Sequence, residues 1–209
     1  MTTHADQDIS SDDQSSDLRR RKKTQLVKRI AHAAGELFQN DGYTAVTMEQ
    51  IAASAEVSKR TLYKYFSAKE AILAHLLESE LARDLAGWES RLEAITSFRK
   101  GASALLAESA AWCERHPDYL LPYIRYKFAT FEPAADPADE RGMVQAWTAL
   151  IAAGQSQGEL DATRPAGQLA IYFHYLYFGA LMRWITDRRL SLAQEFETVV
   201  SLFIEGTRA

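Results

Sequence analysis

Residues 47–69, TMEQIAASAEVSKRTLYKYFSAK, decide the fold of this chain. Thr47 followed by Gln50 forms a capping-box pattern, which marks the start of a helix. The spacing of apolar residues after this cap predicts two short helices, over 48–54 and 59–66, with a tight turn between them. Two short helices joined in this way form a helix-turn-helix.

The apolar and polar side chains of this stretch separate onto different faces. Apolar residues recur four positions apart, so they share the inward face of each helix. This predicted inner face consists of Ile51, Ala55, Leu62 and Phe66, with Val57 filling the corner between the helices. The outer face of the second helix keeps Lys59, Arg60, Tyr63 and Lys64. Such a helix fits the major groove of DNA, where cationic side chains meet bases and phosphates.

Helical patterns also dominate the rest of the chain. One helix is expected to end at Asn40-Asp41-Gly42, and another over 68–86 is expected to end or loosen at Gly87. Further helices are predicted at about 98–115, 118–130, 137–156, 165–187 and 191–206. We find no strand pattern and no internal repeat, so we predict an all-α fold of about nine helices.

Basic residues concentrate around the helix-turn-helix, although the whole chain has a net charge of -4. Residues 1–18 contain five Asp and no Lys or Arg, whereas residues 19–75 contain 11 Lys and Arg against 5 acids, a net of +6. Residues 76–209 have a net of -5. A basic block between acidic ones is typical of a local polyanion site, although a solvated face gives the same count.

These patterns predict three regions. Residues 1–18 are expected to be a disordered acidic tail, because they hold few large apolar groups to offset the entropy of ordering. Residues 19–67 form the predicted helix-turn-helix domain, and residues 68–209 the predicted helical effector-binding and dimerisation domain. The cations Arg19 to Lys23 fit either an arm along the DNA or a solvated segment, and the acidic tail could compete with DNA for them.

The stretch resembles the N-terminal domain of the tetracycline-repressor (TetR) family, whose pattern is roughly T-x-x-x-I-A-x-x-A-G-V-S-x-x-T-x-Y-x-Y-F-x-x-K-E. The matching residues are Thr47, Ile51, Ala52, Ala55, Val57, Ser58, Thr61, Tyr63, Tyr65, Phe66, Lys69 and Glu70. Glu56 departs from the pattern, because the family usually has Gly there; a positive φ at this position would strain a side chain. Outside this stretch and its upstream helix, the chain agrees with the family only in length, helix count and the connection at 158–160.

The resemblance implies a role for each matching polar residue. Lys59, Arg60 and Tyr63 would touch bases, and Thr47, Thr61, Tyr65 and Lys69 would contact phosphates. Ser58 and the outward-facing Lys64 complete the predicted DNA-binding set. Taken singly, Lys64 and Lys69 also fit ordinary solvated lysines, and Tyr65 fits a packing residue.

Aromatic residues concentrate in the C-terminal region, as they do in ligand pockets. We predict ligand contacts from Trp112, His116, Tyr119, Tyr123, Tyr126, Trp147, Phe173 and Tyr177. The same aromatic spacing also fits plain core. An unknown small-molecule effector of this region would release a dimer from a palindromic double-stranded operator, which makes a repressor our leading interpretation.

The last two predicted helices, at about 165–187 and 191–206, carry the expected dimer contact. The first is apolar nearly all round and must be buried on more than one side. The second repeats apolar residues at helical spacing from Phe196 to Ile204. A four-helix homodimer interface would bury both helices, and so would a monomeric core.

Catalysis has little support in this sequence. It lacks a phosphate loop and the common hydrolase and metalloprotease motifs, so we expect no catalytic residues, no cofactor and no metal. Cys113 and His116 share a helical face, which fits a thiol or metal sensor less well than a buried Cys beside a surface His. A single cysteine, no signal-type run and no membrane-length apolar stretch favour a cytoplasmic location and no membrane partner. A helical enzyme or carrier without DNA function and an architectural DNA-binding protein are the alternatives.

Overall fold

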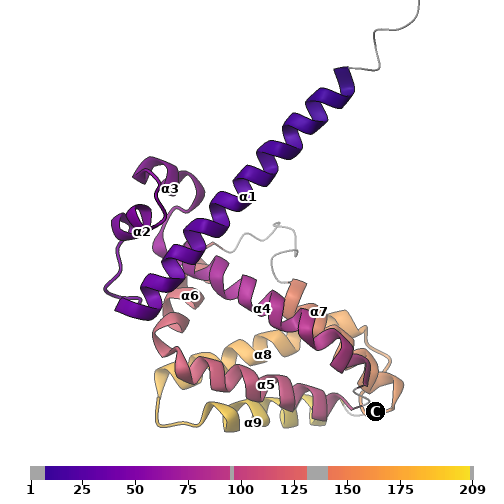
Figure 1. Ribbon diagram of the computed structural model, residues 1–209. Coiled ribbons are helices and arrows are strands. Elements are labelled where there is room, and N and C mark those ends of the chain that lie inside the picture. Colours follow the sequence, from indigo (N-terminus) through magenta and orange to yellow (C-terminus); the bar gives the residue numbers. More distant parts are fainter. Residues whose placement is uncertain (1–7, 95–96, 131–140, 208–209) are drawn as a thin grey trace, which may run out of the picture. The chain divides into compact units, whose positions relative to one another are not determined.

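The computed structural model describes residues 8–94, 97–130 and 141–207, and every regular element within them is a helix (Figure 1). The helices are α1 (Asp8–Asp41), α2 (Met48–Ser54), α3 (Lys59–Tyr65), α4 (Lys69–Ala94), α5 (Phe98–Arg115), α6 (Pro117–Ala129), α7 (Arg141–Ser156), α8 (Ala166–Thr186) and α9 (Leu192–Gly206). The prediction of an all-α fold is confirmed. The chain divides into two compact units, Met1–Leu76 and Leu77–Ala209.

The N-terminal unit packs α1, α2, α3 and the start of α4 around a small apolar core. Phe38 of α1 meets Tyr43 edge-on at 5.1 Å between ring centroids. Other buried residues of this core are Ile30, Ala34, Val46, Ile51, Ala52, Ala55, Leu62, Phe66, Ile72 and Leu73. The residues predicted to face inward in the helix-turn-helix are therefore core residues, apart from the half-buried Val57.

Local hydrogen bonds fix where α2 and α3 begin. Thr47 Oγ1 accepts from the Gln50 backbone N–H, and Thr47 N donates to Gln50 Oε1 at 2.8 Å, so the predicted capping box is present. Ser58 Oγ accepts from the Thr61 backbone N–H at 3.1 Å and caps α3. Between the two helices Glu56 has a φ of 52°, the left-handed conformation that favours glycine at this turn.

The first helix begins earlier than we predicted. Residues 8–18 belong to α1 instead of a disordered tail, while residues 1–7 lie outside the described residues. Asp17 forms ion pairs with Arg20 and Arg21 at 2.8 and 2.9 Å, and such pairs one turn apart stabilise a helix. The division between the units also falls after Leu76, inside α4, and not after residue 67. The N-terminal unit thus includes the first turns of α4.

The C-terminal unit is built around α8, which packs against α7 and α9. Phe173 of α8 lies at its centre, edge-on to Trp147 at 4.8 Å and to Phe98 at 5.3 Å. The Glu159 carboxylate accepts from the backbone N–H groups of Phe98 and Arg99 at 2.7 and 3.0 Å, which satisfies free donors at the start of α5. The connection before α8 is therefore tied to the N-terminus of α5.

Most predicted helix boundaries in this unit hold within a residue or two. The helix predicted over 98–115 matches α5, and those over 118–130, 165–187 and 191–206 match α6, α8 and α9. The helix predicted over 137–156 corresponds to α7, and its residues 137–140 lie outside the described residues. The expected break at Gly87 is wrong, because α4 continues to Ala94. A single helical Gly costs only about 1 kcal/mol, which is too little to end a long helix by itself.

Candidate functional site

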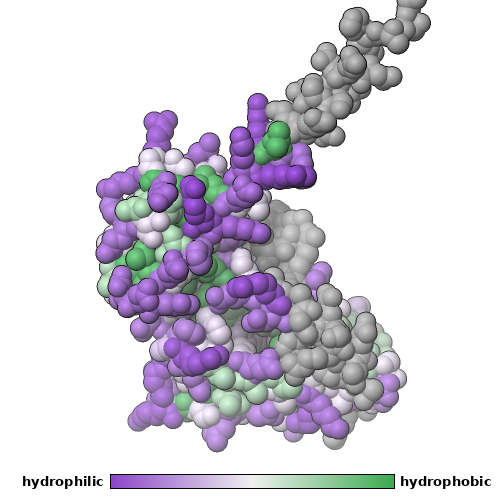
Figure 2. Space-filling view, viewed as in Figure 1, coloured by the Kyte–Doolittle hydropathy of each residue, from purple (hydrophilic) through white to green (hydrophobic). Residues whose placement is uncertain are grey.

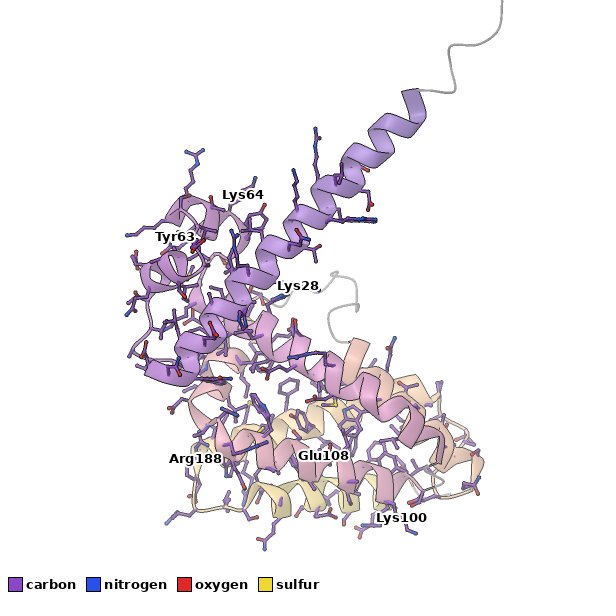
Figure 3. The ribbon with its side chains drawn as sticks, viewed as in Figure 1. Lys28, Tyr63, Lys64, Lys100, Glu108 and Arg188 are labelled. Carbon is purple, nitrogen blue, oxygen red and sulfur yellow. The ribbon has the colours of Figure 1, made fainter. Side chains whose placement is uncertain are left out.

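The outer surface of α3 presents the side chains predicted to reach DNA bases. Tyr63 is 49% exposed although Leu62, one position earlier, is 0% exposed. Lys59, Arg60 and Lys64 are exposed as well. Figure 3 shows Tyr63 and Lys64 on this short helix. The buried face holds α3 in place, so the opposite face is a fixed cationic surface.

An ion pair engages the first cation of this surface. Lys59 Nζ lies 2.9 Å from Glu49 Oε1 of α2, with side-chain exposures of 64% and 52%. The hydrogen bond from Lys59 lowers the pKa of Glu49, so this carboxylate stays charged at neutral pH. To bind a phosphate or a base, Lys59 must therefore first give up its ion pair with the Glu49 carboxylate.

The predicted hydroxyl contacts are already engaged in helix caps. Ser58 Oγ and Thr61 Oγ1 lie 2.8 Å apart, and Thr47 Oγ1 donates to Gln50 Oε1 at 2.9 Å. A hydroxyl oxygen can take part in more than one hydrogen bond, so a cap leaves capacity for a phosphate. Tyr65 is half-buried, and Lys64 Nζ lies 5.9 Å from its ring centroid.

The Lys69 side chain was expected to contact a phosphate, but in the structure it binds backbone oxygens of the protein itself. Its Nζ donates to the backbone oxygens of Tyr43 and Val46, both at 2.7 Å, and lies 4.4 Å from the Tyr43 ring centroid. Burial lowers the pKa of Lys69, which is half-buried. Tyr43 OH in turn donates to Glu70 Oε1 at 3.1 Å. We name these contacts the Lys69 clamp; it ties the segment between α1 and α2 to the start of α4.

The N-terminal part of α1 adds further exposed cations to this unit. All residues from Arg19 to Lys23 are exposed, as is Lys28. Figure 2 shows hydrophilic side chains along the visible face of α1 and α3, and Figure 3 marks Lys28 on α1. The basic block of the sequence is thus a solvent-facing surface, on which Asp17 neutralises part of the charge.

The C-terminal unit contains a cavity of about 460 Å³. Its lining comes from five helices, α4 to α8. The lining residues are Leu77, Glu80, Leu81, Asp84, Leu105, Glu108, Ser109, Ala111, Trp112, Cys113, Arg115, Leu120, Tyr123, Met143, His174, Tyr177, Phe178 and Leu181. The size and the largely apolar lining suit a small organic ligand.

Three of the predicted ligand contacts line this cavity, namely Trp112, Tyr123 and Tyr177. The prediction missed the acidic residues Glu80 and Asp84. Both lie on the face of α4 that also carries Leu77 and Leu81, so carboxylates within an apolar helical face were the available signal. It also missed His174 and Cys113.

The other predicted ligand contacts lie elsewhere. Trp147 and Phe173 are both 0% exposed and belong to the core, because they fill the space between α7, α8 and α5. His116 and Tyr119 stack beside Trp112, with the His116 ring 4.9 Å from Trp112 and 5.2 Å from Tyr119. Tyr126 is half-buried and is not part of the lining. At Trp147 and Phe173 the aromatic spacing therefore reflects core packing.

Burial favours the uncharged forms of three polar groups of the lining, His174, Cys113 and Tyr177. Burial, with a smaller effect of Lys127, lowers the pKa of His174 from 6.5 to about 4. Burial raises the pKa of Cys113 to about 11, so its thiol is not poised as a reactive thiolate. Tyr177 OH and Ser109 Oγ are hydrogen-bonded at 3.0 Å, and burial raises the pKa of Tyr177.

Other kinds of site find no support in the described part of the chain. Across residues 8–94, 97–130 and 141–207, no three His, Cys, Asp or Glu side chains are placed to share a metal ion. Within the same ranges, no helix combines the length and the apolar character that crossing a membrane requires.

One surface of α8 remains apolar and exposed to solvent. Its members lie along one side of the helix, and α9 adds one more residue of the same kind. They are Ile171, Tyr172, Tyr175, Leu176 and Met182 of α8, with Leu202 of α9. We call this the α8 apolar face. Large exposed apolar patches mark interaction sites in soluble proteins.

Comparisons with known proteins agree with the architecture of the N-terminal unit. Residues 30–76 match the family model of "Bacterial regulatory proteins, tetR family". The HTH-type transcriptional repressor KstR of Rhodococcus jostii is 39% identical over 83 residues, which are 40% of this chain and 35% of that repressor. The match thus spans about a third of the curated relative. KstR of Mycobacterium tuberculosis is 27% identical over 77% of this chain and 71% of its own length.

Among solved structures, FadR of Thermus thermophilus, a TetR-family transcriptional repressor in complex with lauroyl-CoA, is similar over most of this chain. It is 26% identical, covers 88% of this chain and 95% of its own, and has a TM-score of 0.69. Its similarity includes the C-terminal unit, which the family model does not cover. Residues 30–76 therefore form a domain of the tetR family of bacterial regulatory proteins, and the all-helical fold of the chain is similar to that of a solved TetR-family repressor.

Proposed function

We propose that this protein is a ligand-responsive transcriptional repressor that binds a palindromic operator as a homodimer and leaves it when an effector fills the C-terminal cavity. The observation that carries the proposal is the fixed cationic outer face of α3, which Leu62 and Phe66 anchor from beneath. No catalytic role is part of the proposal.

The DNA contacts divide by distance from the bases. Arg60 and Tyr63 project from the centre of the exposed face of α3 and would read base edges in the major groove, joined by Lys59 once it leaves Glu49. Lys64, the cap hydroxyls and the cations of α1 would hold phosphates. Lys69 acts from within the protein, because its clamp sets the position of α2 against α4.

A homodimer explains the α8 apolar face. Two copies that pack α8 and α9 against each other would remove Tyr172, Tyr175 and Leu176 from water in a four-helix contact. A two-fold contact of this kind uses the same patch on both copies. It would present two α3 helices to the two half-sites of a palindrome.

The effector would act through α4. This helix begins at the Lys69 clamp, and its later turns line the cavity with Leu77, Glu80, Leu81 and Asp84. A ligand that binds one position of α4 more tightly would shift the dimer towards that position. The distance between the two copies of α3 would then no longer match the two half-sites. The solved lauroyl-CoA complex of FadR is consistent with an organic ligand in this fold.

The test is selection of DNA from a random duplex pool by the full chain. We expect an enriched palindrome, and a binding constant that falls steeply with salt. Arg60→Ala should lower the affinity for the selected duplex by about 1–3 kcal/mol if the side chain reads a base. Lys100→Ala, an exposed cation of the other unit, is the matched control and should bind normally. A chain that enriches no sequence and binds duplex no better than the Arg60 variant would refute the proposal and favour a ligand carrier without DNA function.

A further inference from the structure

The helix α1 extends beyond the core of the N-terminal unit. Its first fully buried residue among the described side chains is Ile30, and every residue from Leu18 to Gln25 is exposed. These exposed residues span more than two helical turns, so no side of this stretch packs against the core. We call residues 18–29 the α1 arm. It precedes residue 30, where the match to the family model begins, and Figure 1 shows α1 continuing past α2 and α3.

The α1 arm carries positive charge that the protein leaves largely unpaired. Its cations, all exposed, are Arg19, Arg20, Arg21, Lys22, Lys23, Lys28 and Arg29, and no Asp or Glu occurs in residues 18–35. Asp17 pairs with Arg20 and Arg21, and none of the other five cations takes part in an ion pair within the described part of the chain. Like charges four residues apart, such as Arg19 and Lys23, destabilise a helix. A bound polyanion would relieve this repulsion.

The surroundings of these cations fit duplex DNA better than a membrane. Leu18 is the single large apolar side chain in residues 18–25, so this stretch has no apolar stripe that could enter a bilayer. A duplex carries a phosphate about every 1.7 Å along its axis, which suits cations spread around a helix. Contacts of Lys and Arg with phosphates carry no direct sequence information.

We infer that the α1 arm is a second, sequence-independent DNA-binding element, which holds phosphates of the duplex beside the half-site that α3 contacts. The inference rests on the proposed function only where it names a half-site. The helix rises by about 18 Å from Leu18 to Ile30, which corresponds to about five base pairs of duplex. The arm would therefore widen the DNA footprint on each side of the palindrome without changing the sequence that is read.

The experiment varies the length of DNA around the selected palindrome. The full chain is titrated with labelled duplexes that carry the palindrome alone, or with about five or about ten base pairs added at each end. We expect the affinity to rise on the order of tenfold with the first five base pairs or so, and little with the rest. Changing the sequence of these flanks should alter the affinity by less than about twofold.

A triple variant assigns this gain to the α1 arm. Arg19→Gln, Lys22→Gln and Lys23→Gln together remove three exposed cations and leave the ion pairs of Asp17 in place. The flanked duplex should bind on the order of tenfold more weakly, and the slope of its salt dependence should fall by about two to three. Binding of the bare palindrome should stay nearly unchanged. Gln favours a helix about as well as Lys and Arg, so the arm should remain helical.

The matched control removes the same charge from the other unit. Lys100→Gln, Arg125→Gln and Arg164→Gln replace three exposed cations of the C-terminal unit. This variant should bind every duplex as the native chain does, with an unchanged salt slope. Circular dichroism of both triple variants checks that the helical content is kept.

The outcomes separate the two proposals. If the arm variant binds the flanked duplex like the native chain, or loses as much affinity for the bare palindrome, the inference is overturned and the repressor proposal stands. A preference of the native chain for anionic phosphatidylserine vesicles over duplex, lost in the arm variant, also overturns it. If no palindrome is enriched, a duplex of unselected sequence takes its place. Weaker binding of that duplex by the arm variant alone supports the inference and refutes the repressor proposal, whereas equal binding refutes both.

Discussion

The two units keep the groups of the proposed function in opposite places. In the N-terminal unit they lie on the outer face of α3, and the residues beneath, such as Leu62, serve only to hold that face. In the C-terminal unit they line an internal cavity, where His174 and Tyr177 are surrounded by protein. An outward site is a property of one short helix, whereas an inward site depends on five helices packing correctly.

Substitutions should therefore act differently in the two units. A change on the outer face of α3 should alter DNA binding and leave stability nearly unchanged, because surface substitutions seldom matter for stability. A change near the cavity should alter stability and ligand binding together. The predictions below test this contrast.

The largest effect is expected from Phe173→Ala. This ring is fully buried between Trp147, Phe98 and Phe203, so its loss should cost about 3–5 kcal/mol in the free energy of unfolding of the C-terminal unit. All four Trp residues follow Leu76, so denaturation monitored by Trp fluorescence reports this unit. The comparison variant is Tyr123→Ala at the cavity lining, which should cost clearly less because an existing cavity borders that ring. If both variants lost the same free energy of unfolding, Tyr123 would be packed as tightly in the core as Phe173.

A pH-dependent loss of stability should come from His174. Its pKa is about 4 in the folded chain and 6.5 in the unfolded one, so below pH 6.5 the unfolded chain takes up a proton that the folded chain does not. The free energy of unfolding should therefore fall as the pH drops from 6.5 towards 4, by up to roughly 3 kcal/mol. His174→Leu should remove this part of the pH dependence in denaturation followed at several pH values. A variant with the same slope as the native chain would show that His174 is readily protonated in place.

Much of the N-terminal unit could be predicted from the sequence because its signals are local. The capping pair Thr47 and Gln50 and the inward pair Leu62 and Phe66 are three and four residues apart, within one helical turn or little more. The outer face of α3 follows from the same spacing. The position of Lys69 could not be predicted, because its acceptors at Tyr43 and Val46 lie 26 and 23 residues away in the chain.

The cavity was harder to predict for a related reason. Phe173 and Tyr177 are four residues apart on one face of α8, and both were predicted to touch ligand. Only Tyr177 lines the cavity, since Phe173 is enclosed by α5, α7 and α9. Helical spacing identifies the buried face of a helix, but neighbours distant in sequence decide whether that face meets side chains or a hollow.

Lys69→Met should cost about 1–3 kcal/mol in the stability of the N-terminal unit, because two backbone oxygens lose their donor. Hydrogen exchange of the α2 amides measures this loss in a unit that contains no Trp. The salt dependence of DNA binding should keep its slope, since Lys69 holds protein atoms and not a phosphate. Lys64→Met is the control with the opposite signature, a slope reduced by about one and unchanged exchange. A reduced slope in the Lys69 variant would restore the phosphate contact expected from the sequence.

The smallest effect is expected from Glu49→Gln, and its sign is the informative part. The carboxylate of Glu49 holds Lys59 at 2.9 Å and places a negative charge beside the surface that would face DNA. Exposed ion pairs contribute little to stability, so the free energy of unfolding should stay nearly unchanged. DNA affinity should rise by less than about fivefold, because Lys59 no longer exchanges one anion for another. Glu36→Gln, which removes an exposed carboxylate of α1, is the matched control for the change in net charge. A lower affinity in the Glu49 variant would mean that the pair positions Lys59 for DNA, and the outer face of α3 would then depend on its neighbours as the cavity does.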